Sequence, residues 1–172
     1  DMAQMFQACT DFDEAIKVAE YELQRLFPEH VGALYIMKES RNHLDRAMEW
    51  GECEEFIESF SPEDCWSLRF GRPHHFSFGD KGVSCSHAGA GREGDDHLCL
   101  PIVAYGETLG ILCLQRNIGE DENASNEAAP SAERLQFCAT VTESLALAIA
   151  NLRLRETLRH QALRDPLTGL FN

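Results

Sequence analysis

The segment from residue 131 to residue 164 most constrains the fold, because it has the pattern of one long helix. Ser131 is a good N-cap, and the pair Asp165-Pro166 breaks the helix at its far end. At 1.5 Å per residue such a helix is about 50 Å long. A compact domain built from the preceding residues, about 130, is narrower than that. We therefore expect the helix to project beyond the domain.

The apolar residues of this segment form two opposed stripes. Leu145, Ile149 and Leu152 lie within about 60° of one another on a helix, so this stripe is expected to cover a sheet. The opposite stripe has heptad spacing with an asparagine at an a position, which favours a parallel two-stranded register. This second stripe consists of Leu147, Asn151, Leu154 and Leu158. It predicts a homodimer through the terminal helices; the alternative is a monomeric helix that lies on its own domain.

The residues before the long helix alternate between helical and strand patterns. Apolar residues at helical spacing predict a leading helix over residues 1–9 and an amphipathic one from Asp11 to Pro28. A further short helix is expected to start at Ser61 and to end at Gly71. The expected strands cover residues 31–38, 43–50, 74–78, 97–105 and 108–115. This order predicts an α+β fold with helices against an antiparallel sheet.

Two loops stand out between these elements. Gly106-Glu107 joins the last two strands, and a glycine in first position predicts a type II′ turn. Residues 79–96 form a loop that carries five glycines and contains Cys85 and His87. A loop of this length inside a compact domain is usually functional.

Composition limits the classes of partner and compartment. The 172 residues carry a formal net charge of −14, which disfavours binding to nucleic acid. No run of eighteen apolar residues is present, so no membrane span is expected. The seven cysteines include no Cys-x-x-Cys pair, and reduced thiols are the default in a chain of this size. These features predict a cytoplasmic protein.

Three stretches of the sequence resemble known signalling families. Residues 164–172 read Arg-Asp-Pro-Leu-Thr-Gly-Leu-Phe-Asn and resemble the N-terminal motif of GGDEF diguanylate cyclase domains. Residues 98–112, which contain Leu-Pro-Ile and Gly-Glu-Thr-Leu-Gly, resemble the hairpin signature of GAF domains. Residues 64–74 resemble a helix of GAF domains that precede GGDEF domains. The resemblance implies a GAF sensor domain over residues 1–130, a signalling helix over residues 131–164 that completes its helical layer, and the start of a truncated GGDEF domain over residues 165–172.

This resemblance implies a regulatory function rather than catalysis by these residues. A small molecule in the GAF pocket, between the sheet, the short helix and the loops, would control a cyclase that condenses two GTP into cyclic di-GMP. GTP and Mg²⁺ would bind only in the missing domain, because the Gly-Gly-Asp/Glu-Glu-Phe loop is absent from this sequence. We therefore expect no catalytic residue and no enzymatic activity here, and a GGDEF domain as the partner within the parent protein.

The same resemblance points to a set of candidate pocket residues. They are Cys65, Trp66, Arg69, Phe70, His75, Cys85, His87 and Cys99. Three thiolates and one imidazole, from Cys65, Cys85, Cys99 and His87, also form a possible tetrahedral metal set.

The sequence leaves other uses of this set open. Buried cysteines are common as small hydrophobic residues, and a redox switch is a further reading. Ser86 separates Cys85 from His87, which argues against the Cys-His pair that attaches bilins in phytochromes. The cysteine spacing of GAF-fold methionine sulfoxide reductases is not matched. A ligand-free module that only dimerises remains an alternative, so no cofactor is assigned.

Overall fold

The chain folds around a six-stranded antiparallel sheet with strand order β3-β2-β1-β6-β5-β4. The structure, a computed structural model, describes residues 2–51, 56–77, 81–88, 96–116 and 130–163. The strands are β1 (His30–Met37), β2 (Leu44–Trp50), β3 (Ser59–Phe60), β4 (His74–Ser77), β5 (Asp96–Ala104) and β6 (Glu107–Arg116). The helices are α1 (Met2–Ala8), α2 (Phe12–Leu26), α3 (Trp66–Phe70) and α4 (Ala132–Leu163), with 3₁₀ turns η1 (Pro62–Asp64) and η2 (Ser86–Ala88). The predicted α+β class is confirmed.

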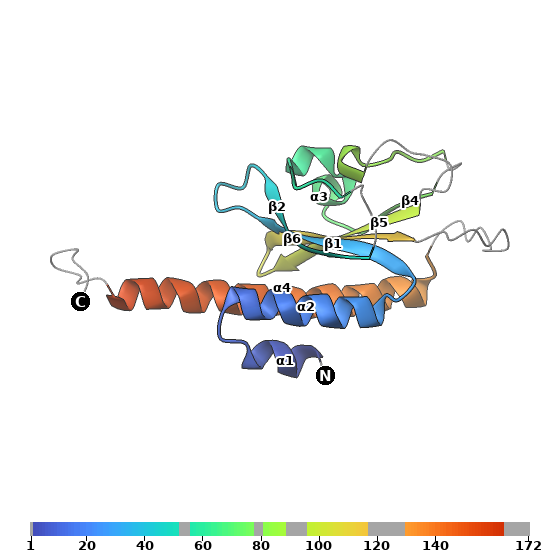
Figure 1. Cartoon of the computed structure of the whole chain (residues 1–172). Coiled ribbons are helices and arrows are strands. Elements are labelled where there is room, and N and C mark those ends of the chain that lie inside the picture. The colour runs from blue at the N-terminus through green and yellow to red at the C-terminus, as the bar shows by residue number, and fades with distance from the viewer. Residues whose placement is uncertain (1, 52–55, 78–80, 89–95, 117–129, 164–172) are drawn as a thin grey trace.

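Helices and turns cover both faces of the sheet. Helices α2 and α4 lie on one face with α1 packed outside them, and α3 lies on the other face (Figure 1). Side chains alternate along the strands, so Leu34 and Leu112 pack under the three helices while Tyr35 and Ile111 face the α3 side. The apolar residues on both faces explain why the strands read as continuous hydrophobic runs.

The expected helix after Ser61 is divided in two. Ser61 caps η1 with a capping box closed by Asp64, as the sequence pattern indicates. Cys65 then takes an extended conformation before α3 begins at Trp66, and its side chain is fully buried under the α3 face. Gly71 ends α3 with φ of 67°, in the left-handed region that glycine tolerates best.

The turn between β5 and β6 differs from the expectation. Ala104 pairs with Glu107, so the two loop residues are Tyr105 and Gly106 rather than Gly106 and Glu107. Both have positive φ, 54° and 77°, which is the pattern of a type I′ turn. The type II′ prediction was wrong because the strand register is one residue away from the one assumed, and a non-glycine residue takes the first left-handed position.

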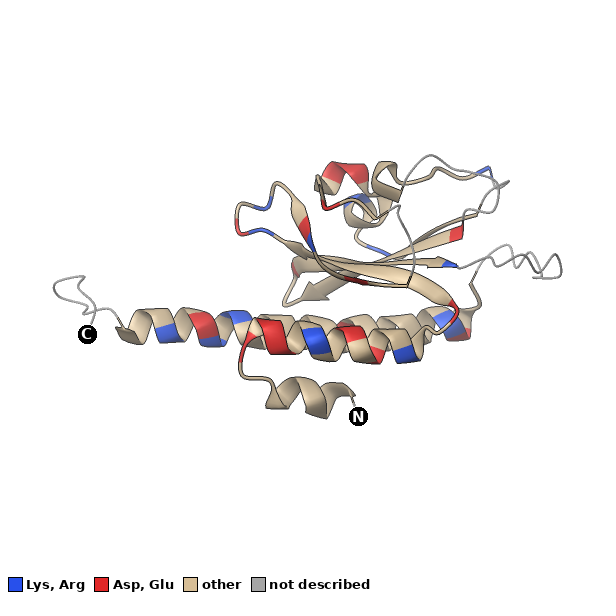
Figure 2. Cartoon of the chain, viewed as in Figure 1, with Lys and Arg blue, Asp and Glu red and all other residues tan. Residues whose placement is uncertain are grey.

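Helix α4 has a covered part and an exposed part. The stripe of Leu145, Ile149 and Leu152 is buried on the helical side of the sheet, as predicted. Every residue from Leu154 to Leu163 is exposed, and the helix runs past the edge of the sheet toward the C-terminus (Figure 1). Figure 2 shows charges of both signs along this projecting part. The 32 residues of the whole helix α4 span about 48 Å.

By length and composition alone, α4 would also be able to cross a membrane. It contains an 18-residue window with a mean hydropathy of 1.3 and few charges. However, 44% of that window is buried inside the fold, and a helix that packs on its own sheet passes the same test. The expectation of no membrane span therefore stays a prediction, as does the cytoplasmic location. The GGDEF-like motif of residues 164–172 lies outside the described residues.

Candidate functional site

The α3 face of the sheet brings together four of the predicted site residues. The donor atoms of Cys65, Cys85, His87 and Cys99 all lie within 4.8 Å of one another, and all four residues are buried. The sulfur atoms of Cys65 and Cys85 are 4.0 Å apart, and the sulfur of Cys99 lies 3.6 Å from Nε2 of His87. We call these four residues the Cys₃His cluster.

The members of the Cys₃His cluster come from three separate segments of the chain. Cys65 occupies the extended link between η1 and α3, and Cys99 lies in the middle of β5. Cys85 directly precedes η2, and its sulfur accepts a hydrogen bond from the backbone N–H of Trp66 at 3.3 Å. His87 lies inside η2. The cluster therefore joins the α3 segment and the η2 segment to the centre of the sheet.

Aromatic rings fix the orientation of the histidine. The ring of His87 stacks on Phe60 with centroids 4.1 Å apart and planes 8° apart. Tyr35 packs edge-on against the same phenylalanine, and its hydroxyl donates to the carbonyl of Ile57 at 2.7 Å. Burial raises the pKa of Tyr35 above its usual value, so this hydroxyl stays protonated.

Hydrogen bonding within the cluster makes its thiols unequal. The hydrogen bonds to Cys65 and Cys99 lower the pKa of Cys85 below its usual value. The pKa of Cys65 is raised in turn by its hydrogen bond to Cys85, and the pKa of Cys99 is raised by its contact with Cys113.

The α3 face is filled by its own side chains over the described residues. A cavity of about 10 Å³ lies beside Cys99, His87 and Cys113, with room for about one water molecule. His97 also lines it, and its Nε2 atom is buried without a hydrogen-bond partner among the described residues. His97 is not among the site residues predicted from the sequence. Its position two residues before Cys99 on one strand, and hence on the same face, is the signal that would have found it.

Three candidate pocket residues form the outer surface of α3. Trp66 and Phe70 stack with centroids 5.4 Å apart, and the guanidinium of Arg69 lies 4.1 Å above the Trp66 ring. Phe70 is 58% exposed, whereas Trp66 is partly buried over the α3-face core. Trp66 therefore packs on the α3-face core, whereas Arg69 and Phe70 are exposed to solvent.

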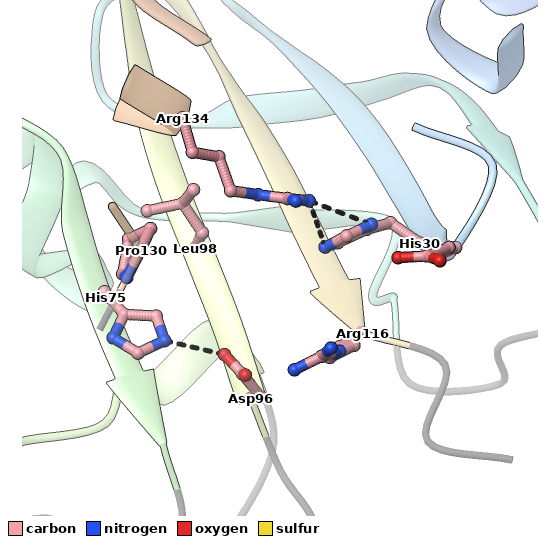
Figure 3. A pocket seen from close by; sticks show the side chains of 8 residues that line it. His30, His75, Asp96, Leu98, Arg116, Pro130 and Arg134 are labelled. Atoms are coloured by element: carbon pink, nitrogen blue, oxygen red, sulfur yellow. Dashed lines mark hydrogen bonds and ion pairs between the residues drawn. The ribbon is translucent and has the colours of Figure 1, made fainter. Parts of the chain in front are cut away.

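His75 lies apart from the cluster, in a small pocket at the end of the sheet (Figure 3). Its Nε2 atom is 2.7 Å from a carboxylate oxygen of Asp96. Arg116 and Arg134 line the same pocket of about 60 Å³, which connects the ends of β5 and β6 to the first turns of α4. The structure therefore does not bring His75 together with the cysteines.

A partly buried histidine in this second pocket contacts Arg134 and lies near Arg116. Nη2 of Arg134 lies 2.9 Å from Nε2 of His30, across the start of α4 (Figure 3). Burial, followed by the charges of Arg134 and Arg116, lowers the pKa of His30 from 6.5 to about 4. His30 is therefore neutral at physiological pH and can accept a hydrogen bond from Arg134.

The predicted dimer stripe lies on the accessible side of α4. Leu147, Leu154 and Leu158 are 45%, 58% and 55% exposed, and Asn151 is exposed in phase with them. Leu147 and Asn151 line a groove of about 160 Å³ between α4 and α1, which also includes Phe6. A partner helix on this stripe would therefore lie next to α1.

No family model and no curated protein matches this chain in sequence. Solved structures match it well in shape. A GAF domain from a phosphoenolpyruvate-protein phosphotransferase of Coxiella burnetii superposes with a TM-score of 0.66 at 20% identity, covering 91% of this chain and 92% of that one. A domain of a putative two-component sensor histidine kinase of Sinorhizobium meliloti gives 0.62 at 14% identity, covering 88% and 99%.

An enzyme is also among the similar structures. The free methionine-R-sulfoxide reductase of Neisseria meningitidis, solved with its substrate, gives a TM-score of 0.67 at 11% identity, covering 90% of this chain and 87% of that one. Identities this low establish shape rather than activity. The chain therefore has the GAF fold, with a six-stranded antiparallel sheet and a long C-terminal helix.

Proposed function

We propose that this chain is a regulatory GAF domain that senses a ligand on the α3 face and transmits its state through α4 to a GGDEF diguanylate cyclase domain starting at residue 165. The observation that carries the proposal is the division of α4. Its first part is packed on the sheet, whereas all of its last ten residues, from Leu154 to Leu163, are exposed. A helix of this kind transmits a change in the sheet to whatever follows it.

Dimerisation is the second part of the proposal. A diguanylate cyclase joins two GTP molecules held by two facing domains, so the geometry between the two chains controls the rate. The exposed stripe of Leu147, Asn151, Leu154 and Leu158 has the spacing of a parallel coiled coil. Pairing two such helices would set the distance and phase of the two catalytic domains.

Sedimentation of residues 1–172 tests the dimer. We expect a dimer at micromolar concentration, and a monomer when Leu154 and Leu158 are both replaced by Glu. The matched control is Glu156→Lys, which changes a charge on the same helical turn outside the a and d positions. A parent chain that stays monomeric, or a dimer that survives both leucine changes, would refute this interface.

Helix phase tests the transmission in the full-length protein. Inserting one alanine after Arg155 rotates the downstream domain by about 100°, and we expect cyclic di-GMP synthesis from GTP to change strongly. Inserting a complete heptad at the same point preserves the phase, so activity should return toward that of the parent. Equal activity of the two insertion variants would argue that α4 is only a linker.

The packing of the α3 face supports a second candidate function. The cavity that described residues form beside the Cys₃His cluster is about 10 Å³, too little for an organic ligand. The domain would then act as an interaction module that only dimerises. A ligand panel distinguishes the two: a thermal shift with any small molecule favours the sensor, and none favours the module.

A further inference from the structure

The Cys₃His cluster is unusual because four metal-binding side chains meet in an apolar interior. Burying a polar imidazole is costly unless its nitrogens are bonded. The hydrogen bond that the structure gives to Nε2 of His87 is to the sulfur of Cys99. A thiol is a weak hydrogen-bond partner, so simple hydrophobic packing does not account for a histidine at this position.

The distances within the cluster agree with a tetrahedral zinc site. With bonds of about 2.3 Å to sulfur and about 2.0 Å to nitrogen, two sulfur ligands are separated by about 3.8 Å, and sulfur and nitrogen by about 3.5 Å. The separation of the Cys65 and Cys85 sulfurs is 4.0 Å, and that of the Cys99 sulfur and His87 Nε2 is 3.6 Å. All four donor atoms fit within 4.8 Å. A disulfide, in contrast, needs sulfurs about 2.05 Å apart.

The surroundings also have the features of a metal site. The Trp66 N–H bonds the sulfur of Cys85, and the stacked Phe60 ring holds the plane of His87, so two ligands are oriented by their neighbours. The unpartnered Nε2 of His97 is buried in the cavity that also borders Cys99. The cluster lies among the apolar residues of the α3-face core.

We propose that Cys65, Cys85, His87 and Cys99 bind one zinc ion, which ties the α3 and η2 segments to strand β5. Three sulfur ligands and one imidazole form a closed four-coordinate set, which is the donor set of structural zinc rather than of catalytic zinc. This binding site stands whether or not the chain controls an output domain. If the sensory proposal also holds, the ion or its loss is the signal on the α3 face.

Metal analysis of the reduced, tag-free chain of residues 1–172 is the first test. We expect about one zinc ion per chain after purification without added metal. After removal by a chelator, Co²⁺ should bind with the intense visible absorption of a tetrahedral site and a thiolate-to-metal charge-transfer band. A folded, reduced chain that holds no zinc and gives no Co²⁺ spectrum would overturn the proposal, and stoichiometric iron would overturn the zinc assignment.

Substitutions locate the site. Cys85→Ala should weaken zinc binding by about 100-fold or more, measured by chelator competition. Cys99→Ser should lower the charge-transfer intensity of bound Co²⁺ by about one third, because one of three thiolates is lost. The control is Cys138→Ala, which removes an equally buried cysteine on the opposite side of the sheet.

A second control tests the limits of the ligand set. The Cys113 sulfur lies 4.0 Å from that of Cys99 but does not belong to the four-residue cluster, so Cys113→Ala should keep both the zinc and the charge-transfer intensity. Circular dichroism of each variant confirms the fold. Zinc content that is unchanged in Cys85→Ala, or lost in Cys113→Ala, would refute the assignment of ligands.

Discussion

Acid is expected to destabilise the fold through His30. Burial and the two nearby arginines hold its pKa at about 4 in the folded chain, below the ordinary value of 6.5. Between these two values the unfolded chain binds more protons than the folded one, so stability rises with pH from about 4 to 6.5 and levels off above. Lowering the pH therefore weakens the fold in this window.

The magnitude follows from the shift. If the pKa of His30 is 6.5 in the unfolded chain and about 4 in the folded one, the free energy of unfolding at pH 5 is lower by about 2 kcal/mol before screening. His30 is partly exposed, and solvent screening reduces this to about 1 kcal/mol. His30→Gln cannot take up the proton, so it should lose this part of the pH dependence.

Urea unfolding at pH 5 and pH 7.5 provides the assay, with the ring of His30 titrated in parallel by NMR. Arg134→Gln should raise the pKa of His30 toward its ordinary value, because it removes the second cause of the shift. Arg159→Gln is the control, since Arg159 is exposed far along the same helix. If the His30 ring titrates near 6.5 in the parent, or if His30→Gln keeps the full pH dependence, the electrostatic account of this pocket is wrong.

Three further stability changes follow from the packing, each measured as the free energy of unfolding in urea. Gly110→Ala should cost about 2–4 kcal/mol, because a Cβ atom there would overlap the carbonyl oxygen of Tyr35 on the neighbouring strand. Leu145→Ala should cost about 3–5 kcal/mol, whereas Leu154→Ala on the same helix should change the monomer by less than about 0.5 kcal/mol. Asp11→Ala removes the cap that accepts the backbone N–H of Glu14 and should cost about 1 kcal/mol.

Periodicity predicted the sheet and the helices because their signal is local. The strand at residues 31–38 and the hairpin were placed within one residue of β1, β5 and β6. The turn type was missed because it depends on register: Tyr105 accepts a positive φ only because the two flanking strands pair at Ala104 and Glu107. The break in the helix at Cys65 was also missed. Cys65 is extended because its thiol is buried in the core, and a local sequence pattern does not show that burial.

Part of the candidate site could be predicted from the alternation of side chains between the two faces of the sheet. Cys99 pairs with His74, and His75 pairs with Leu98, which faces the helices. Cross-strand partners lie on the same face of the sheet. Once the register of β4 and β5 is known, His75 and Cys99 are therefore expected on opposite faces. The approach of Cys65, Cys85 and His87 was predicted only from the fold that the sequence resembles, because no local pattern connects a helix start to a loop.

Strand β5 offers a direct path from the Cys₃His cluster to α4. Cys99 faces the cluster, while Leu98 and Leu100 on either side of it face the core under the helices. Helix α4 packs mainly on β5, whereas α2 packs on β2. A displacement of Cys99 therefore moves its two neighbours against α4, since a close-packed core transmits strain.

Hydrogen exchange tests this path if the cluster binds zinc. Removing the ion from the 172-residue chain should speed amide exchange in β5 around Leu98–Leu100 and in α4 around Val141–Ile149, because both lose the restraint on Cys99. Exchange in α2 should change little, because α2 packs on β2, which lies three strands away from β5 in the sheet. Equal changes in α2 and α4 would mean that the metal stabilises the whole domain uniformly, and β5 would then have no special part in the connection. Faster exchange confined to α3 and η2 would also contradict the path through β5, because the effect would end at the face where the ion binds.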